Sequence, residues 1–295
     1  MRANRSLLAI SAGLAALAVA ATISAAQSAP VHARPAKPQR IMSANLCTDL
    51  LLLMLVPRQR ISSITHLAHD AVDVLMPGAD RGIGINHGTA EEVVREQPDL
   101  ILASPWATGT MRRLAAKVGA PVVEVDSGNS FADIRKLTLQ VGALVGETAR
   151  AQALVARMDR TLRELAATRP ARTVRVVAWS GAGSVPGKGT LTDEIIRAAG
   201  AQNIAAKYDD SRVSSFGIEE LLMARPDAIM RGEDRYDQPS LQETTLEHPV
   251  IRRAFRGRQI SYPASLYTCG LPQSADAARQ LRQALAQLPA GGVSW

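Results

Sequence analysis

One phrase occurs twice in this chain, and the duplication limits the folds open to it. "TAEEVVREQPDLIL" runs from Thr89 to Leu102, and "FGIEELLMARPDAIM" runs from Phe216 to Met230. Each contains Glu-Glu, two aliphatic residues, three variable residues, Pro-Asp and an apolar run, and the second copy lies 128 positions after the first. A helical segment closed by proline and followed by an apolar run is typical of a helix that leads into a buried strand. The repeat therefore indicates two units of one architecture.

Strand-like and helical segments alternate around both copies of the phrase. Runs that read as strands cover residues 40–44, 59–65, 99–104 and 120–126 in the first half and 173–179, 227–232 and 258–265 in the second. Thr48-Asp49, at the start of the first helix with Asn45 or Thr48 near its cap, has an echo in Thr192-Asp193. Such alternation is typical of parallel sheets covered by helices. We predict the α/β class, with two Rossmann-like lobes that each hold a parallel sheet.

The region between the two halves has helical periodicity and no strand pattern. Ser130 and Asp133 form a capping-box pattern ahead of the first helical segment. The second segment, residues 147–168, spans roughly 33 Å if it is one helix of about 22 residues. We predict that this long spine helix joins the lobes. The predicted domains are an N-terminal lobe over 40–127, a connecting region over 128–169 and a C-terminal lobe over 170–295.

The N-terminus has the pattern of an export signal. Arg2 and Arg5 precede an apolar run over residues 7–23, and the small residues Ser24-Ala25-Ala26 suit a signal peptidase. We predict cleavage after Ala26, which makes residues 1–26 a signal peptide, with an uncleaved anchor as the alternative. Residues 27–39 contain three prolines and no apolar periodicity, so we expect a disordered leader. The mature protein is expected to be soluble and exported.

The composition and motifs argue against nucleic-acid binding and against catalysis. Basic residues outnumber acidic ones by 34 to 27 but are scattered, and aromatic residues make up only 3% of the chain. No Gly-x-Ser-x-Gly or His-Glu-x-x-His motif occurs. The loop "GAGSVPGKGT" (181–190) departs from the P-loop pattern at Ala182 and Gly189, and an exported protein meets no ATP. We predict no enzymatic activity, and an exported hydrolase remains the alternative.

Together these features resemble a known family of transport proteins. The export signal, the duplicated lobes, the spine helix, "RIMSANLCTDLLLLML" and "LYTCGLP" are similar to the periplasmic substrate-binding proteins of iron–siderophore and cobalamin ABC importers. The resemblance covers residues 40–288, although no single motif is as specific as a P-loop. It implies a periplasmic monomer, with no intrinsic cofactor, that carries a metal chelate between its lobes to a permease dimer and its ATPase in the inner membrane. The implied ligand is an iron–siderophore first, then cobalamin or haem; a free zinc or manganese ion is the alternative.

The resemblance also implies how the protein would meet its permease. In the family, one glutamate at the tip of each lobe docks on the permease, and Glu91 and Glu219 match those positions. Their neighbours Glu92 and Glu220 are expected to cap their helices from within, Glu92 together with Thr89. The alternative for all four is that they only complement the helix dipole.

Ligands of open α/β sheets bind at the carboxyl ends of the strands. The side chains expected there are Asn45, His66, His69, Asn86, His87 and Trp106 in the first lobe and Trp179, Arg231 and Tyr267 in the second. Aromatic faces suit a corrin, a porphyrin or a catecholate, but they can also pack locally over the sheets. The histidines can ligate a metal ion, with Tyr267, Glu233 or Asp234 as partners, or can lie on the surface.

Cys47 and Cys269 are the only cysteines in the chain. An oxidising periplasm favours a disulfide, and strand-end positions place one cysteine near the cleft from each lobe. We predict that the two residues are bonded and tie the lobes together. Two buried thiols, or a redox or metal role, are the alternatives.

Overall fold

The computed structural model describes residues 37–106, 109–179, 184–207, 213–233, 245–289 and Val293. Residues 34–295 form one compact unit. The predicted signal peptide, most of the predicted leader and Asp234 lie outside the described residues.

The first lobe is built around a five-stranded parallel sheet. Its elements are β1 (Ile41–Ser43), α1 (Leu46–Leu55), the 3-10 helix η1 (Arg58–Arg60), β2 (Ile61–Thr65), α2 (Ala68–Leu75), β3 (Gly84–Asn86), α3 (Ala90–Glu96), β4 (Leu100–Ala103), α4 (Gly109–Lys117) and β5 (Val122–Glu124). The strand order is β3-β2-β1-β4-β5, and every pair is parallel. β1 and β4 are buried on both faces, as expected for strands covered by helices on each side.

The second lobe repeats that order. Its elements are β6 (Arg175–Ala178), β7 (Ser184–Pro186), α7 (Leu191–Ala198), β8 (Gln202–Asn203), η2 (Ile204–Lys207), β9 (Val213–Ser215), α8 (Ile218–Ala224), β10 (Ala228–Glu233), α10 (Pro249–Ala254), β11 (Gln259–Pro263), α11 (Ala264–Thr268) and α12 (Ser274–Ala286). The parallel order β11-β10-β6-β8 matches β5-β4-β1-β2 of the first lobe. β7 and β9 form a separate antiparallel pair, so part of the predicted loop 181–190 is a strand.

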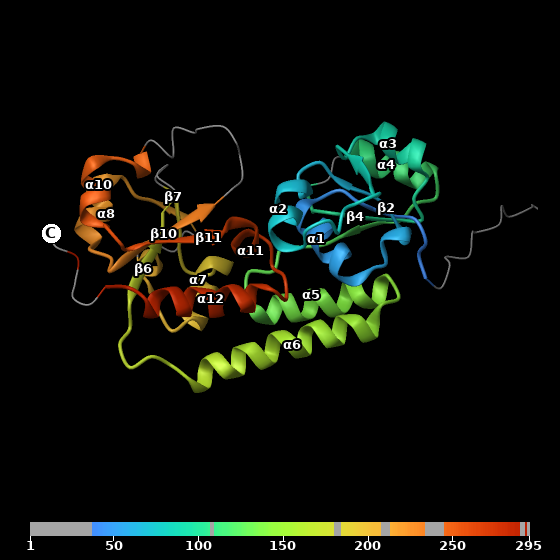
Figure 1. The fold of residues 1–295 in the computed structure, drawn as a ribbon. Helices are drawn as coiled ribbons and strands as arrows, with labels where there is room; N and C mark the ends of the chain where they lie inside the picture. Colours follow the sequence, from blue (N-terminus) through green and yellow to red (C-terminus); the bar gives the residue numbers. More distant parts are fainter. Residues whose placement is uncertain are drawn as a thin grey trace, which may run out of the picture. The chain divides into compact units, whose positions relative to one another are not determined.

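Two helices connect the lobes (Figure 1). α5 (Phe131–Leu144) begins at Ser130, whose hydroxyl accepts the amide of Asp133, and α6 (Thr148–Ala167) follows after a short turn. α5 and α6 pack closely because Gly142 has no side chain: a Cβ there would lie 2.3 Å from the Cβ of Ala151. α6 also contacts α12 of the second lobe. The α/β fold with two parallel-sheet lobes and a long spine helix is confirmed.

The largest apolar core is continuous between the lobes. It runs from β1 and α1 through α5 and α6 to α7 and α12. Polar contacts fix α6 on both sides: Arg135 of α5 reaches Asp159 at 2.5 Å, and Arg279 of α12 donates to the hydroxyl of Thr161 at 2.6 Å. The spine helix is therefore held along its length by both neighbours.

The Pro-Asp half of the repeated phrase shapes the connection from a helix to a central strand. α3 ends at Gln97 with φ 45°, and α8 ends at Arg225 with φ 48°. The aspartate that follows then accepts backbone amides at the start of the first strand of its lobe: Asp99 takes the amide of Arg40 at 3.0 Å, and Asp227 takes that of Arg175 at 2.8 Å. Both aspartates also donate their own amide back to the carbonyl of that arginine.

An arginine completes the same clamp in each lobe. The guanidinium of Arg40 donates to the carbonyl of Glu96 at the end of α3, and that of Arg175 donates to the carbonyls of Ala224 and Arg225 at the end of α8. Carbonyls at a helix end have no partner within the helix, so these bonds satisfy groups that would otherwise cost free energy. The sequence prediction found the phrase but missed the two arginines, which lie outside it.

Candidate functional site

The strand order places four of the predicted first-lobe residues in one row. His87 follows β3, His66 follows β2, Asn45 follows β1 and Trp106 follows β4, and neighbouring strands of this sheet are all parallel. Because parallel strands end at the same edge, these side chains belong to the carboxyl edge of the first sheet. His69 is different, because it lies inside α2 and hydrogen-bonds Asp80 at 3.2 Å.

The two histidines of the row stack on each other. The ring centroids of His66 and His87 are 4.6 Å apart with an interplanar angle of 22°. Both residues are exposed, and Nδ1 of His87 lies 3.4 Å from Oε1 of Glu92. The pair forms a flat, accessible imidazole surface that suits contact with a planar ligand.

Trp106 is the most exposed large hydrophobic residue among those described, with 90% of its surface accessible. An indole this exposed contributes no core packing, which leaves it open to a ligand. Asn45 serves the fold instead: it is the N-cap of α1, and its Oδ1 accepts the amide of Cys47 at 2.9 Å.

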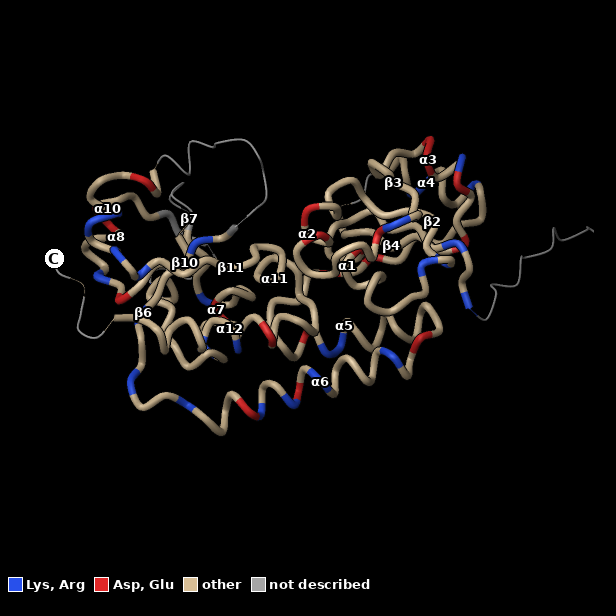
Figure 2. Tube along the Cα trace, viewed as in Figure 1, with Lys and Arg blue, Asp and Glu red and all other residues tan. Residues whose placement is uncertain are grey.

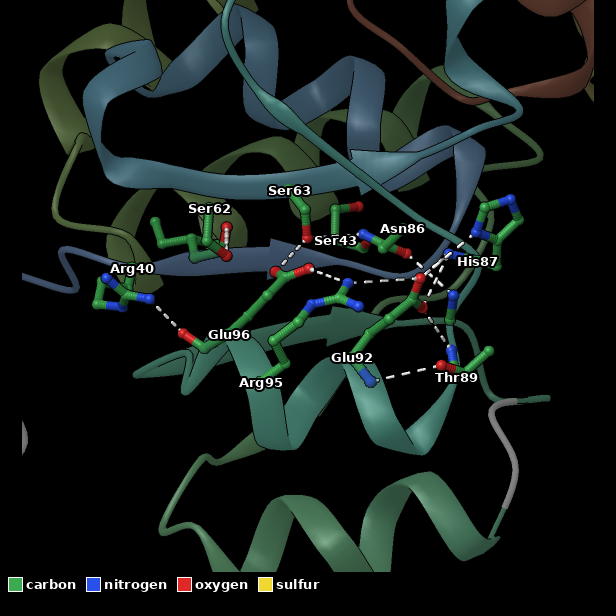
Figure 3. Close-up of polar contacts among 12 residues, drawn as sticks. Arg40, Ser43, Ser62, Ser63, Asn86, His87, Thr89, Glu92, Arg95 and Glu96 are labelled. Atoms are coloured by element: carbon green, nitrogen blue, oxygen red, sulfur yellow. Dashed lines mark hydrogen bonds and ion pairs between the residues drawn. The ribbon is translucent and has the colours of Figure 1, made fainter.

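Asn86 does not face a ligand, which corrects the prediction. The residue is fully buried, and its amide group donates to the carbonyl of Ser43 and the hydroxyl of Ser63 while its oxygen accepts the amide of Gly88 (Figure 3). A buried amide must be satisfied internally, and here the network that joins β1, β2 and β3 does so. Sequence position at a strand end could not distinguish this inward side chain from its outward neighbour His87.

Glu92 has the local role that its spacing predicts. Its carboxylate accepts hydrogen bonds from the backbone amides of Thr89 and His87, both at 2.9 Å. In turn, the backbone amide of Glu92 donates to the hydroxyl of Thr89 (Figure 3). Burial by itself raises the pKa of Glu92, but these hydrogen bonds together outweigh it and lower the pKa below its ordinary value. The capping box fixes the start of α3 and leaves Glu91 free of that task.

Two aromatic predictions in the second lobe are wrong in the same way. Trp179 is 1% exposed and donates its indole N–H to the carbonyl of Phe216, so it belongs to the core. Tyr267 is also buried, and burial raises its pKa far above the ordinary value. Both side chains pack locally over the sheet, which was the alternative to ligand contact.

Tyr262, which the sequence prediction did not single out, takes the position expected for Tyr267. It lies at the carboxyl end of β11, is half-buried and packs against Tyr267 with ring centroids 4.1 Å apart. A Cβ at Gly232 on the neighbouring strand would lie 3.5 Å from the phenol oxygen of Tyr262. Arg231, one residue earlier on β10, is partly exposed at the same edge and lies 3.5 Å from Glu247. The available signal was that Tyr262 falls inside the run 258–265 that the sequence predicts as a strand.

The two lobes are linked covalently where their backbones meet. Cys47 of α1 and Cys269, directly after α11, form a disulfide that closes a sequence separation of 222 residues. Next to it, the backbones of Gly128 and Gly270 touch: a Cβ on Gly270 would lie 2.5 Å from the carbonyl oxygen of Gly128. Any larger residue at position 270 would therefore collide with backbone.

A pocket of about 910 Å³ lies beside this seam. Its lining comes from the carboxyl end of β5 and the segment after it (123–130), from α5 (Asp133, Lys136, Leu137, Gln140, Val141 and Leu144) and from the start of α7 (Gly189, Thr190, Asp193, Glu194 and Arg197). Both lobes thus contribute the edges at which α/β proteins bind ligands. None of the residues predicted for the ligand lines this pocket, because the prediction overlooked the end of β5 and the start of α7.

Glu91 and Glu219 occupy equivalent places. Each is the second residue of its helix, α3 or α8, and each is exposed. Acidic residues stand at the tip formed by α3, whereas charges of both signs alternate along α6 (Figure 2).

Asp49, buried under the first sheet, gives stability a pH dependence. It is fully inaccessible, its Oδ2 accepts the hydroxyl of Thr65 at 2.5 Å, and its Oδ1 makes no hydrogen bond within the described part of the chain. Burial raises its pKa from 3.8 to about 7, against the hydrogen bonds with Ser43 and Thr65, which lower it. In the second lobe the matching Asp193 accepts a bond from Asn203 at 3.2 Å.

We expect the protein to lose stability as the pH rises from about 4 to about 7. In that window the native state holds a proton on Asp49 that the unfolded chain releases, so the free energy of unfolding falls as pH rises, by on the order of 3 kcal/mol in total. Thermal unfolding of the wild type and of Asp49→Asn between pH 4 and 8 checks this. The variant should gain stability relative to the wild type as the pH rises, and parallel curves would contradict the assignment.

The described ranges contain neither a membrane-spanning helix nor a cluster of metal-binding side chains. No helix in them is long and apolar enough to cross a membrane. Nor do those ranges bring three His, Cys, Asp or Glu side chains together in a group that could hold a metal ion.

Similar proteins with this fold include several periplasmic binding proteins. Two strains of Halobacterium salinarum have cobalamin-binding proteins that are 26% identical over 212 residues; the match covers 68% of this chain but only 56% of theirs. Among solved structures, the periplasmic haem-binding protein HutB of Vibrio cholerae is 18% identical with a TM-score of 0.69, and the alignment covers 84% of this chain and 98% of that one. An ABC-type Fe³⁺-hydroxamate transport protein from Saccharomonospora viridis is 19% identical with a TM-score of 0.64, over 84% and 93%.

These structural similarities support the fold, and a family model supports the relationship in sequence. The model described as periplasmic binding protein matches residues 53–253, which is more than half of the chain and takes in both copies of the repeated phrase. The chain therefore belongs to the periplasmic binding protein family.

Proposed function

We propose that this protein is the solute-binding component of an ABC importer and that it carries a metal chelate in the pocket between its lobes. The observation that carries the proposal is the 910 Å³ pocket, lined by the carboxyl edge of one sheet and the start of a helix at the other. The relatives named above bind cobalamin or haem or belong to an Fe³⁺-hydroxamate transport system, so a chelate is the ligand class that they share.

Exposed side chains at the carboxyl edges of the two sheets, outside the pocket lining, would add further contacts to a ligand. The stacked His66 and His87 and the exposed Trp106 stand at the carboxyl edge of the first sheet, and Tyr262 and Arg231 stand at that of the second. Flat rings suit the planar part of a chelate, and Arg231 offers hydrogen-bond donors. Glu91 and Glu219 would then meet the permease.

Native mass spectrometry of the protein purified from its own periplasm tests the proposal. A complex whose added mass equals that of a metal chelate supports it, and a bare metal ion would favour the free-ion alternative. Titration with the identified chelate should quench tryptophan fluorescence, and Trp106→Phe should reduce that quenching because Trp106 is the exposed tryptophan of the described residues. Turnover of ester or phosphoester substrates, with no chelate bound, would overturn the proposal in favour of a hydrolase.

A further inference from the structure

The pocket between the lobes has a surplus of negative charge, and we propose that this charge restricts the ligand to chelates of zero or positive net charge. The inference rests on the proposed function, because it names the class of chelate for the same pocket. Three observations support it: the count of charges in the lining, the ion pairs that Arg197 already makes, and the aliphatic side chains of the wall.

Acidic residues outnumber basic ones in the lining. The carboxylates are Glu124, Asp126, Asp133, Asp193 and Glu194, and the cations are Lys136 and Arg197. The lining residues therefore have a formal net charge of −3, which becomes −2 once Arg112, which pairs with Glu124 from outside the lining, is counted. Opposite charge raises the local concentration and affinity of a ligand, whereas like charges facing each other weaken binding.

Arg197 is already engaged within its own helix. Its guanidinium lies 3.8 Å from the carboxylate of Asp193 and 3.4 Å from that of Glu194. These two acids also stand in the first turn of α7, where the helix dipole would otherwise attract an anion, and the hydroxyl of Thr190 accepts the amide of Asp193. The carboxylates of Asp193 and Glu194 thus already occupy the start of α7, where an anionic ligand would otherwise be attracted.

Asp126, just after β5, and Asp133, in the first turn of α5, accept hydrogen bonds from neutral groups. Oδ1 of Asp126 accepts the amide of Ser127 at 2.8 Å, and Oδ2 of Asp133 accepts the hydroxyl of Ser130 at 2.7 Å. Both residues are exposed at the pocket. A neutral donor does not cancel a carboxylate charge, so the negative potential is centred on these two residues.

Aliphatic side chains form part of the wall, together with neutral polar residues such as Asn129 and Gln140. Val123, Leu137, Val141 and Leu144 line the pocket from β5 and α5. An apolar wall beside carboxylates suits a neutral ferric trihydroxamate, the same chelate with a protonated amine, or a corrin ring edged with amides. It disfavours a ferric tricatecholate, a citrate complex and the propionates of haem, because each would bring carboxylate-like charge against Asp126 and Asp133.

The test compares chelates of one framework that differ in net charge, with two anionic chelates, ferric enterobactin and haem, as references. Dissociation constants are measured with the purified protein for cationic ferrioxamine B against its anionic N-succinyl derivative, for cyanocobalamin against the acids made by hydrolysing its side-chain amides, and for ferric enterobactin and haem. Whichever framework binds, its neutral or cationic member should bind at least about 10-fold more tightly than its anionic partner, and added salt should reduce the difference.

Variants assign that preference to the pocket. Asp126→Asn should reduce the preference, and Asp126→Lys should abolish or reverse it. Glu164→Gln and Glu164→Lys, on the exposed face of α6 away from the lining, should leave it unchanged. Any of three results would overturn the inference while leaving chelate transport intact. The anionic members could bind as tightly as their partners or more tightly, enterobactin or haem could bind best, or the charge preference could be unchanged in the Asp126 variants. If no chelate of any charge binds, the proposed function itself fails, and the inference with it.

Discussion

Reversing the charge of both tip glutamates, as Glu91→Arg with Glu219→Arg, should reduce chelate uptake by at least about 100-fold, since like charges across an interface cost several kcal/mol. The two side chains are exposed at matching positions of α3 and α8. Neither lines the pocket, so the affinity for the chelate should not change. Uptake of labelled chelate by cells that lack the native protein, together with the dissociation constant of the purified variant, measures both quantities.

The control places the same charge change elsewhere on the surface. Asp70→Arg with Glu164→Arg alters two exposed acids on α2 and α6 and should leave uptake close to the wild-type level. Glu92 is unsuitable as a control because it caps α3. A double tip variant that still imports the chelate at the normal rate would rule out docking through Glu91 and Glu219. One that loses chelate affinity would show that these residues do not separate docking from capture.

Removing the disulfide, as Cys47→Ser with Cys269→Ser, should produce the largest loss of stability in the protein. The bond closes a loop whose ends are 222 residues apart, and restricting the unfolded chain to that extent stabilises the native state by about 5 kcal/mol in the chain-entropy model. For a protein of this size we expect the melting temperature to fall by roughly 10–20 °C. Thermal unfolding followed by circular dichroism measures it.

Reductant provides the matched comparison. Because the chain has two cysteines, reductant should lower the melting temperature of the wild type and have no effect on the double variant. Cys269 is fully buried, so the wild type should respond only after prolonged incubation or partial unfolding. If the double variant has the same melting temperature as the oxidised wild type, the packing at Gly128 and Gly270 is enough to hold the lobes together at the seam.

Repetition in the sequence made the architecture predictable. The two phrases led to two lobes because helix, turn and strand follow each other in the same order in both, and the spacing of apolar residues in α5 and α6 identified the connecting helices. Short edge elements escaped detection: β8 has two residues and β3 has three, too few for a strand pattern. The strands of the pair β7 and β9 also have three residues each, and β7 lies within the run 181–190 that was predicted as a loop.

Individual site residues were harder to predict, because a strand end fixes position along the sheet but not the direction of a side chain. His87 points outward and its predecessor Asn86 inward, as alternation along a strand requires. Trp179 follows its strand as expected and Tyr267 lies in α11 instead of at a strand end, and both fill the core. The pocket lining after β5 consists of Asp, Ser, Gly and Asn, a composition that also marks an ordinary loop, so no signal in the sequence distinguished it.

The seam between the lobes affects how empty and loaded molecules would compete in the proposed delivery to a permease. Spine helices, a disulfide and two touching glycines all join the halves, which leaves little freedom for one half to swing against the other. Empty and loaded molecules should then present the same pair of tip glutamates at nearly the same separation. Unloaded copies would occupy the transporter as competitors, and import should slow when this protein is produced in excess over its cargo.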